Sequence, residues 1–273
     1  MPEMAEVETV RNVLKKQILH KKIKDLKVLY PKMIQTNIND FKKNLINEEF
    51  IDIKRKGKYL LFETNNYFLI SHLRMEGKYF IKNANEDIIK HEHVIFTFND
   101  NTTLRYHDVR KFGVMFLVKK DELNKVKELN KLGYDVNDKN LTPSYLLDKL
   151  KNKKLPIKTV LLDQKIISGL GNIYADEVLF KSKINPLKKA NEINEFEANA
   201  IISSSKEIID KAISLGGTTI RSYTSSLGVK GNYQDYLQVH KREGENCNIC
   251  GNKIIRIKVG TRSTYYCKVC QKI

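Results

Sequence analysis

Hydrophobic positions near the start of the chain repeat with the period of a helix. Val7, Val10, Leu14 and Ile18 are spaced three or four residues apart, so they would share one helical face. Three glutamates fall in or near the first turn, where the helix dipole stabilises acidic side chains. The pattern predicts an amphipathic helix that begins directly behind Pro2.

From about residue 50 to residue 118 the pattern changes to alternation of apolar and polar positions. The stretches KYLLFETNNYFLISHL and HVIFTFNDNTTLRYHDV each place a polar turn between two runs of β-forming residues, as hairpins do. We therefore expect this part to be mostly sheet. A short helical pattern follows over Asp121 to Leu132, and the irregular GYDVNDKN behind it is predicted to be a linker.

Helical patterns dominate the second half of the chain. In LTPSYLLDKL, Thr142 can cap a helix and Pro143 suits its first position. Asn194, followed three residues later by a glutamate, predicts the start of a long helix over 195–214. The Gly, Ser and Thr-rich stretch GGTTIRSYTSSLGVKGNYQ behind it is predicted to be a mobile loop. Two further helices are predicted, at 156–165 and 172–182.

Charge narrows the class of partner. The 273 residues include 49 lysines and arginines against 32 acidic residues, a net charge of +17 with a pI near 9.5. A surface this basic favours a polyanionic partner, most simply nucleic acid, although a solvated lysine-rich surface is the alternative. No apolar run is long enough for a membrane span and no signal-peptide pattern opens the chain, so we expect a soluble protein of the cytoplasm. A monomer is expected as well.

Four cysteines form two C-x-x-C pairs near the end of the chain. The pairs are separated by sixteen residues, and each can hold one side of a tetrahedral zinc ion. Disulfides are the alternative, disfavoured in a reducing compartment. Strand-like KIIRIKV and TYYC lie between the pairs, so Arg262 is expected at the tip of a metal-bound hairpin. The predicted zinc ligands are Cys247, Cys250, Cys267 and Cys270.

Three separated motifs, MPEMAEVET, GLGNIYADEVLF and GTRSTYYCKVCQ, resemble the bacterial formamidopyrimidine-DNA glycosylases over essentially the whole chain. The resemblance implies an α+β fold: an N-terminal β-sandwich flanked by helices, a helix-two-turns-helix domain and a C-terminal zinc finger with one structural zinc ion. It also implies a DNA-repair enzyme whose partner is double-stranded DNA containing oxidised bases. The expected boundaries are 1–133 for the sandwich, 134–141 for the linker, 142–236 for the helical domain with a lesion-capping loop, and 237–273 for the finger.

The same resemblance assigns the catalytic residues. After removal of Met1, the secondary amine of Pro2 would attack the sugar of a damaged nucleotide and form an iminium, which acidifies the neighbouring C2′ proton. Glu3 would be the proton donor, with helix capping as its alternative and as the more plausible role of the next two glutamates. Lys58 would assist base recognition and β-elimination. Arg262 would grip the phosphates and assist δ-elimination, because its planar fork suits phosphate.

Other residues are implied as DNA contacts. Asn172 would bind phosphate at a helix start, and His91 and Lys153 would be further contacts. A base inside a duplex must be flipped out before chemistry, and its place must be filled. The residues that match the family's fillers are Met75, Arg110 and Phe112, although Met75 and Phe112 taken without the resemblance would be interpreted as core residues.

Two other functions stay open. The sister endonuclease VIII type prefers oxidised pyrimidines, but GGTTIRSY and GNYQDYLQVHKREGENC look like the purine-lesion branch. A non-catalytic zinc-ribbon protein that binds nucleic acid would also explain the charge and the cysteines. The predicted function is excision of 8-oxoguanine opposite cytosine and of formamidopyrimidines, followed by β,δ-elimination.

Overall fold

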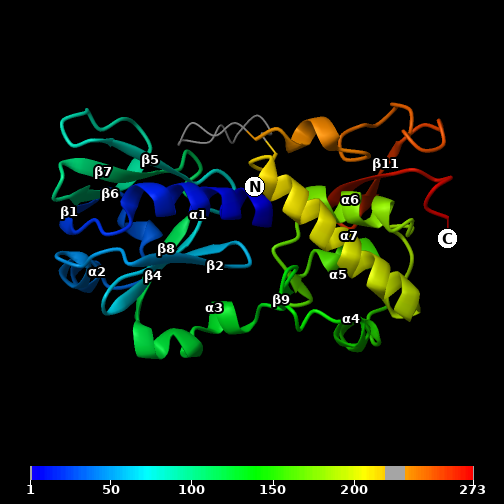
Figure 1. Ribbon diagram of the computed structural model, residues 1–273, viewed down its shortest axis with the longest axis horizontal. Helices are drawn as coiled ribbons and strands as arrows, with labels where there is room; N and C mark the ends of the chain where they lie inside the picture. Colours follow the sequence, from blue (N-terminus) through cyan, green and yellow to red (C-terminus); the bar gives the residue numbers. More distant parts are fainter. Residues whose placement is uncertain (1, 219–230, 273) are drawn as a thin grey trace. The chain divides into compact units, whose positions relative to one another are not determined.

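The computed structural model describes residues 2–218 and 231–272. Its chain divides into two compact units (Figure 1). The first unit comprises Met1–Asn130 and Gly216–Gly231, and the second comprises Lys131–Leu215 and Asn232–Ile273.

Two four-stranded antiparallel sheets form the first unit. The first sheet has the order β1-β6-β7-β5, with β1 at Ile23–Val28, β6 at Glu92–Phe98, β7 at Thr102–His107 and β5 at Lys78–Asn83. The second has the order β2-β3-β4-β8, with β2 at Asp52–Lys56, β3 at Tyr59–Glu63, β4 at Tyr67–His72 and β8 at Val114–Lys119. Both predicted hairpins are confirmed, as β3 with β4 and β6 with β7.

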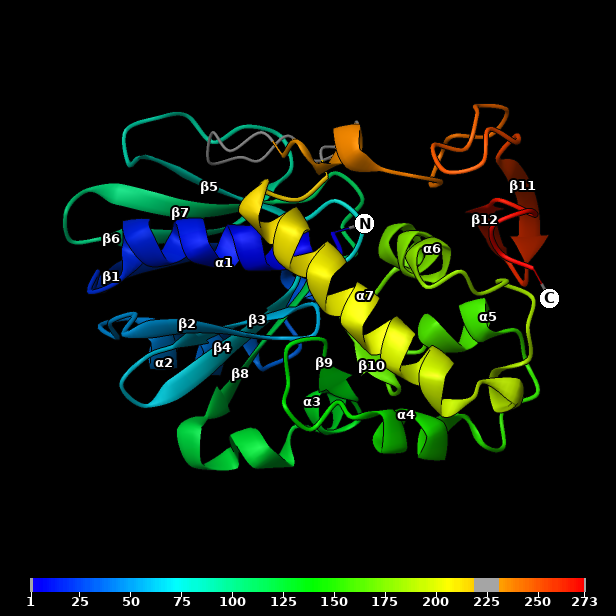
Figure 2. The ribbon, with the colours of Figure 1, turned by 45° about the vertical axis from the view of Figure 1, so that its right-hand side comes forward.

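Aromatic side chains from both sheets share one core. The ring of Phe50 lies 5.5 Å from that of Phe62 and 6.1 Å from those of Phe96 and Phe98, between centroids. Removing an aromatic ring of this size from water stabilises the fold by about 1.5–3 kcal/mol. Helix α1 (Met4–Ile18) adds its predicted apolar face to this core. Figure 2 shows α1 running alongside the strands of both sheets, and α2 (Ile38–Leu45) contacts β1.

The segment behind β8 differs from the prediction. In place of one helix over Asp121 to Leu132, the chain forms the 3-10 helix η2 (Lys120–Lys125) and the single turn α3 (Lys127–Asn130). No residue of η2 is buried, so an α-helix here would have had no apolar face to pack. A further 3-10 turn, η1, covers Pro31–Met33.

Helices dominate the second unit, as predicted. Helix α7 (Glu195–Ser214) packs against α6 (Asn172–Lys181) and α4 (Pro143–Leu150), and the Asn194 capping box and the Thr142 cap are both present. The helix predicted at 156–165 is shorter, because α5 covers only Ile157–Leu161. Beyond it the side chain of Gln164 bonds the backbone of Gly169 and Leu170, which folds the chain back. Short elements complete the unit: η3 (Ala190–Glu192) and η4 (Tyr233–Tyr236).

The predicted irregular linker is wrong at its first residues. Tyr134–Asp135 form strand β9, which pairs in parallel with β10 (Ile167–Ser168), and Ser168 Oγ donates to Asp135 Oδ1 at 2.6 Å. Most of the predicted mobile loop, residues 219–230, lies outside the described residues.

The predicted fold class is confirmed. The chain has an N-terminal part of two sheets with helices, a helical part, and a C-terminal hairpin of β11 (Ile255–Val259) and β12 (Arg262–Tyr266) with four cysteines. Within the described residues, no helix is both long and apolar enough to cross a membrane.

Candidate functional site

The start of α1 is buried. Pro2 is buried at the chain's beginning, and Glu3 is only 3% exposed. Glu3 is the N-cap of the helix and forms a capping box with Glu6, whose Oε2 accepts from the Glu3 amide at 2.9 Å. Capping was expected of Glu6 more than of Glu3, yet both carboxylates take part. The capping box therefore holds the Glu3 backbone in place beside Pro2.

Glu6 has a second role that the sequence did not indicate. Its Oε1 accepts hydrogen bonds from the backbone N–H of Thr218 at 2.8 Å and from its hydroxyl at 2.9 Å. Gly217 approaches the same oxygen so closely that a Cβ there would lie 2.9 Å away. The chain that leads into residues 219–230 is thus anchored at the start of α1.

Lys58 lies in the tight turn between β2 and β3 and is 6% exposed. Gly57, which precedes it, has a φ of +56°, a backbone conformation that glycine adopts readily. Arg55 Nη1 donates to the Gly57 carbonyl at 2.8 Å, and Arg55 Nε donates to Glu8 Oε2 at 2.8 Å. This chain of contacts ties the Lys58 turn to the helix that begins behind Pro2.

Electrostatics set the charge states of two side chains near the Lys58 turn, Glu8 and His72. Burial alone would raise the pKa of Glu8, but hydrogen bonds from Arg11 and Arg55 lower it, so the carboxylate stays charged. His72 lies at the end of β4, opposite the first residue of β3. Burial, assisted by the charges of Arg74 and Lys58, lowers the pKa of His72 to about 3, so its imidazole is neutral at ordinary pH.

Two loops of the first unit carry the predicted base-stack fillers. Met75 lies partly exposed in the turn between β4 and β5, and Phe112 is 51% exposed in the loop between β7 and β8. The guanidinium of exposed Arg110 lies over the Phe112 ring, 4.8 Å from its centroid. Neither Met75 nor Phe112 is a core residue, so the alternative role considered for them is wrong.

Asp108 organises the second of these loops. Its fully buried carboxylate accepts from the backbone N–H of Arg110 at 3.0 Å and of Gly113 at 2.8 Å. Its own N–H donates to the His91 carbonyl at 3.0 Å, and its carbonyl is bonded by His93 Nε2 at 2.9 Å. The predicted DNA contact His91 is thereby linked to the Arg110 loop.

In the second unit, Asn172 and the cysteine hairpin are joined. Asn172 opens helix α6, and its Nδ2 donates to the Ser263 carbonyl at 2.9 Å. Arg262, the neighbour of Ser263, is exposed at the first position of β12 behind Gly260, which has a φ of +59°. Two predicted phosphate contacts are thus linked through one hydrogen bond.

Lys153 occupies another place in the second unit. It is exposed directly behind α4. Its amide donates to the Leu150 carbonyl at 2.8 Å, and its carbonyl accepts from the Asn191 amide at 3.0 Å. These bonds fix its backbone between α4 and η3.

A buried ionic network underlies the junction of Asn172 with the hairpin. Lys158, fully buried, contacts Asp176 Oδ1 and donates to the Asn172 carbonyl at 3.0 Å, while Asp176 Oδ2 is bonded by His240 Nδ1 at 2.7 Å. The His240 ring packs edge-on against Tyr265 of β12, 5.1 Å between centroids. Because buried charges need partners, this network holds α5, α6 and the hairpin in one arrangement.

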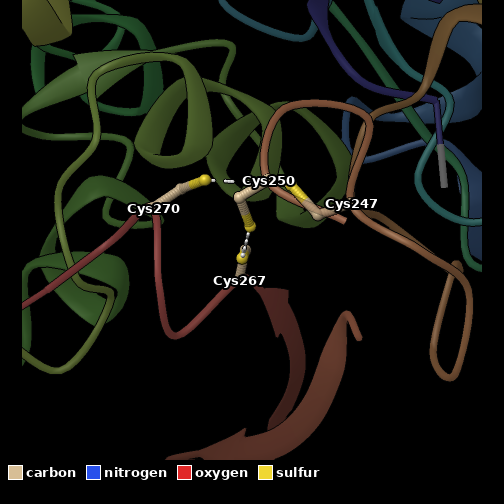
Figure 3. A group of neighbouring side chains, drawn as sticks. All are labelled: Cys247, Cys250, Cys267 and Cys270. Atoms are coloured by element: carbon tan, nitrogen blue, oxygen red, sulfur yellow. Dashed lines mark hydrogen bonds between the residues drawn. The ribbon is translucent and has the colours of Figure 1, made fainter. Parts of the chain in front are cut away.

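The four cysteines converge as predicted. Their sulfur atoms all lie within 4.8 Å of one another, with Cys247 and Cys270 3.8 Å apart and Cys250 and Cys267 3.4 Å apart, and the side chains turn toward one another (Figure 3). Four thiolates this close together would repel one another without a cation to neutralise them, and tetrahedral S₄ sites of this kind select zinc.

Family models match three parts of the chain: the formamidopyrimidine-DNA glycosylase N-terminal domain at residues 1–115, its H2TH domain at 132–224, and the zinc finger found in FPG and IleRS at 244–273. The chain belongs to the formamidopyrimidine-DNA glycosylase family. It is therefore a DNA glycosylase, and its four cysteines form the site of one structural zinc ion.

Relatives within this family are similar over their full length. The formamidopyrimidine-DNA glycosylase of Ligilactobacillus salivarius is 46% identical, covering 100% of this chain and 99% of its own. That of Listeria innocua is 44% identical, covering 100% of both. A solved complex of the Lactococcus lactis protein with DNA containing an abasic site matches with a TM-score of 0.94 at 41% identity, over 99% of this chain and 100% of that one. Another complex, of a mutant of the Lactococcus lactis protein with DNA containing Fapy-dG, has a TM-score of 0.94 at 41% identity and covers 100% of both chains.

The sequence did not reveal the supporting roles of Arg55 and Asp108. Arg55 resembled one more member of a basic run, and Asp108 resembled an ordinary turn residue. An acid and a glycine five positions apart, as Asp108 and Gly113 are, are too common in turns to reveal a buried loop-closing carboxylate.

Proposed function

We propose that the chain is a bifunctional DNA glycosylase and abasic-site lyase that excises oxidised purines, with the Pro2 amine as nucleophile. The observation that carries the proposal is the group of buried residues in the first unit. Pro2 and Glu3 open α1, and the Glu8–Arg55–Gly57 contacts tie the Lys58 turn to the same helix. The Lys58 turn and the two residues before α1 are therefore tied to one packed helix, which supports a shared role for them.

In the proposed reaction, Pro2 nitrogen attacks the sugar C1′ and the bond from C1′ to the damaged base breaks. The base leaves with the bonding electron pair and takes up a proton, and the Pro2 nitrogen loses its own proton. Glu3 then protonates the ring oxygen O4′, the C1′–O4′ bond breaks, and the opened sugar carries the iminium. This iminium is an electron sink, so loss of the C2′ proton expels the 3′ phosphate and a second elimination expels the 5′ phosphate. Lys58 acts in base recognition and in the first elimination.

Other residues bind the DNA in this proposal. Arg262 and Asn172 hold phosphates, with His91 and Lys153 as further contacts, and the charge of +17 supplies the long-range attraction. The fillers of the gap left by the flipped nucleotide are Met75, Arg110 and Phe112. The complexes of the Lactococcus lactis protein with abasic and Fapy-dG DNA support this partner, and the bacterial relatives support action on chromosomal DNA in the cytoplasm.

Borohydride trapping tests the nucleophile. We would mix Met-processed protein with duplex DNA carrying 8-oxoguanine opposite cytosine, add borohydride and look for a covalent protein–DNA band. The band should be strong in the wild type and largely lost in Pro2→Gly. Pro31→Gly is the matched control, because this proline is exposed at the start of η1 and cannot supply a terminal amine, so the band should stay intact.

Each alternative predicts another result. Faster cleavage of thymine glycol DNA than of 8-oxoguanine DNA would assign the chain to the endonuclease VIII type. Absence of a band with every oxidised base, at saturating DNA binding and with an intact N-terminal proline, would favour the non-catalytic binder.

A further inference from the structure

Two glycines in different loops meet the same oxygen atom. Tyr106 lies near the end of β7 and is fully buried. A Cβ added to Gly77 would lie 2.0 Å from the Tyr106 hydroxyl oxygen, and a Cβ added to Gly113 would lie 1.8 Å from it. Since real Cβ atoms do not approach a heavy atom so closely, both backbones rest directly on this hydroxyl.

Each glycine closes a loop that carries proposed base-stack fillers. The Gly77 N–H donates to the Leu73 carbonyl at 3.0 Å and closes the turn that contains Met75. The Gly113 N–H donates to Asp108 Oδ2 at 2.8 Å and closes the loop that contains Arg110 and Phe112. Both loops therefore contact the Tyr106 side chain at the glycine that closes each of them.

The support beneath that side chain is rigid. The Tyr106 ring packs edge-on against Tyr79 with 5.1 Å between centroids, and Tyr79 packs in the same way against Phe62 at 5.4 Å. The rings are held by this packing, and the Tyr79 hydroxyl donates in addition to Ser71 Oγ at 2.7 Å, away from the two loop glycines. Because packed cores do not deform continuously, the Tyr106 oxygen is a fixed point, whereas the loop tips above it are exposed.

We propose that Tyr106 is a positioning residue that sets the separation of the Met75 turn and the Arg110–Phe112 loop, so that both enter the DNA in register when a nucleotide is flipped. This inference rests on the proposed function. The fillers must occupy one gap in the base stack together, so a displacement of one loop relative to the other weakens insertion without touching Pro2 or Lys58. Misplacement by about 1 Å can cost on the order of 100-fold in rate.

The test compares Tyr106→Phe with Tyr79→Phe. Both variants lose one phenol oxygen from the same core, but only the Tyr106 oxygen supports the two loop glycines. Single-turnover excision of 8-oxoguanine and cleavage of a preformed abasic site are measured for each. Flipping an abasic nucleotide breaks no base stacking, so its cleavage depends less on insertion of the fillers. Tyr106→Phe should therefore lower base excision about tenfold more than abasic-site cleavage. Tyr79→Phe should lower both equally or not at all.

A second readout follows insertion directly. The duplex carries 2-aminopurine opposite a tetrahydrofuran abasic analogue, and its fluorescence is read at saturating protein. Tyr106→Phe should lose most of the wild-type fluorescence change, whereas Tyr79→Phe should keep it. In Gly113→Ala the added Cβ would displace the Arg110–Phe112 loop from the Tyr106 hydroxyl, so this variant should resemble Tyr106→Phe. It is used as the second test if Tyr106→Phe folds poorly.

The outcomes separate the two proposals. If Tyr106→Phe and Gly113→Ala keep the wild-type fluorescence change and the wild-type ratio of the two rates, Tyr106 has no positioning role. If the wild type itself neither excises base nor changes the fluorescence, the proposed function fails first.

Discussion

Two tight turns present the two basic catalytic candidates, and they are stabilised in opposite ways. Lys58 follows Gly57 between β2 and β3 and is buried. Arg262 begins β12, two residues behind Gly260 of the β11–β12 turn, and is exposed. The Lys58 turn joins β2 and β3, whose buried residues Ile53 and Leu60 belong to the large apolar core of the first unit. The Arg262 hairpin packs on a small cluster in which the four cysteines take the place of most of the apolar side chains.

This contrast indicates that rigidity can come from burial or from a metal, according to the chain length available. A hairpin of about thirty residues cannot bury enough apolar surface to offset the entropy of its own ordering, so a structural metal supplies the missing stability. A buried lysine, in turn, needs the walls of a large core and ionic ties such as Glu8–Arg55. Perturbations of metal, charge and pH should therefore affect the two turns differently.

Removal of zinc should produce the largest difference in stability between the Lys58 turn and the Arg262 hairpin. Structural zinc sites contribute about 10–16 kcal/mol in isolated fingers at neutral pH, so chelation should unfold the β11–β12 hairpin. Limited proteolysis should then cut within residues 247–270, while the first unit keeps its melting temperature. Cys267→Ser should reproduce this result without chelator, and a hairpin that resists proteolysis after verified zinc loss would contradict the prediction.

Substitution of the buried lysine should act on chemistry. Lys58→Met should lower the rate of base excision and elimination by about 10²–10⁴-fold, the range for loss of a positioned acid–base group. Lys54→Met, on strand β2 just before the Lys58 turn, is the control, because its side chain is 52% exposed and pairs with Glu63 at the surface. Equal rates for the two variants in single-turnover assays would show that Lys58 is an ordinary member of the basic run.

Substitution of the exposed arginine should act on binding. Arg262→Gln should weaken DNA binding about tenfold at moderate salt and reduce the slope of log affinity against log salt by about 1. The matched change is Lys258→Gln on β11, which removes one positive charge from the same hairpin. If both variants show the same slope and the same elimination products, Arg262 contributes only general charge.

Acid should destabilise the first unit through His72. Its pKa is about 3 in the folded state and about 6.5 when unfolded, so between these values only the unfolded chain takes up the proton. Above pH 6.5 His72 is neutral in both states and costs no stability. Below pH 6.5 the free energy of unfolding falls by about 1.4 kcal/mol per pH unit because of this residue. Denaturant unfolding of the zinc-loaded protein at pH 7 and pH 5 measures the effect. His72→Gln should flatten the pH dependence; an unchanged dependence would assign it to other groups.

Local patterns predicted the elements with strong periodicity and clear caps. The apolar face of α1, both hairpins and the Asn194 cap of α7 were all readable, because each depends on residues close together in the chain. The 121–132 segment was not, because its helical spacing had no partner surface that the sequence could reveal. The short α5 was missed for a related reason, because the side chain of Gln164 bonds backbone groups behind it and turns the chain.

The metal site, the polyanionic partner and the family motifs follow from the order of residues alone. Thiol spacing, charge and motif identity are properties along the chain, and none of them requires a fold to be recognised. Only the tertiary structure shows which groups support those motifs. Arg55 joins α1 to the Lys58 turn, Glu6 accepts hydrogen bonds from Thr218, and Tyr106 contacts the Met75 turn and the Arg110–Phe112 loop. These contacts join residues up to 212 positions apart, and burial gives them their strength. No local pattern records them.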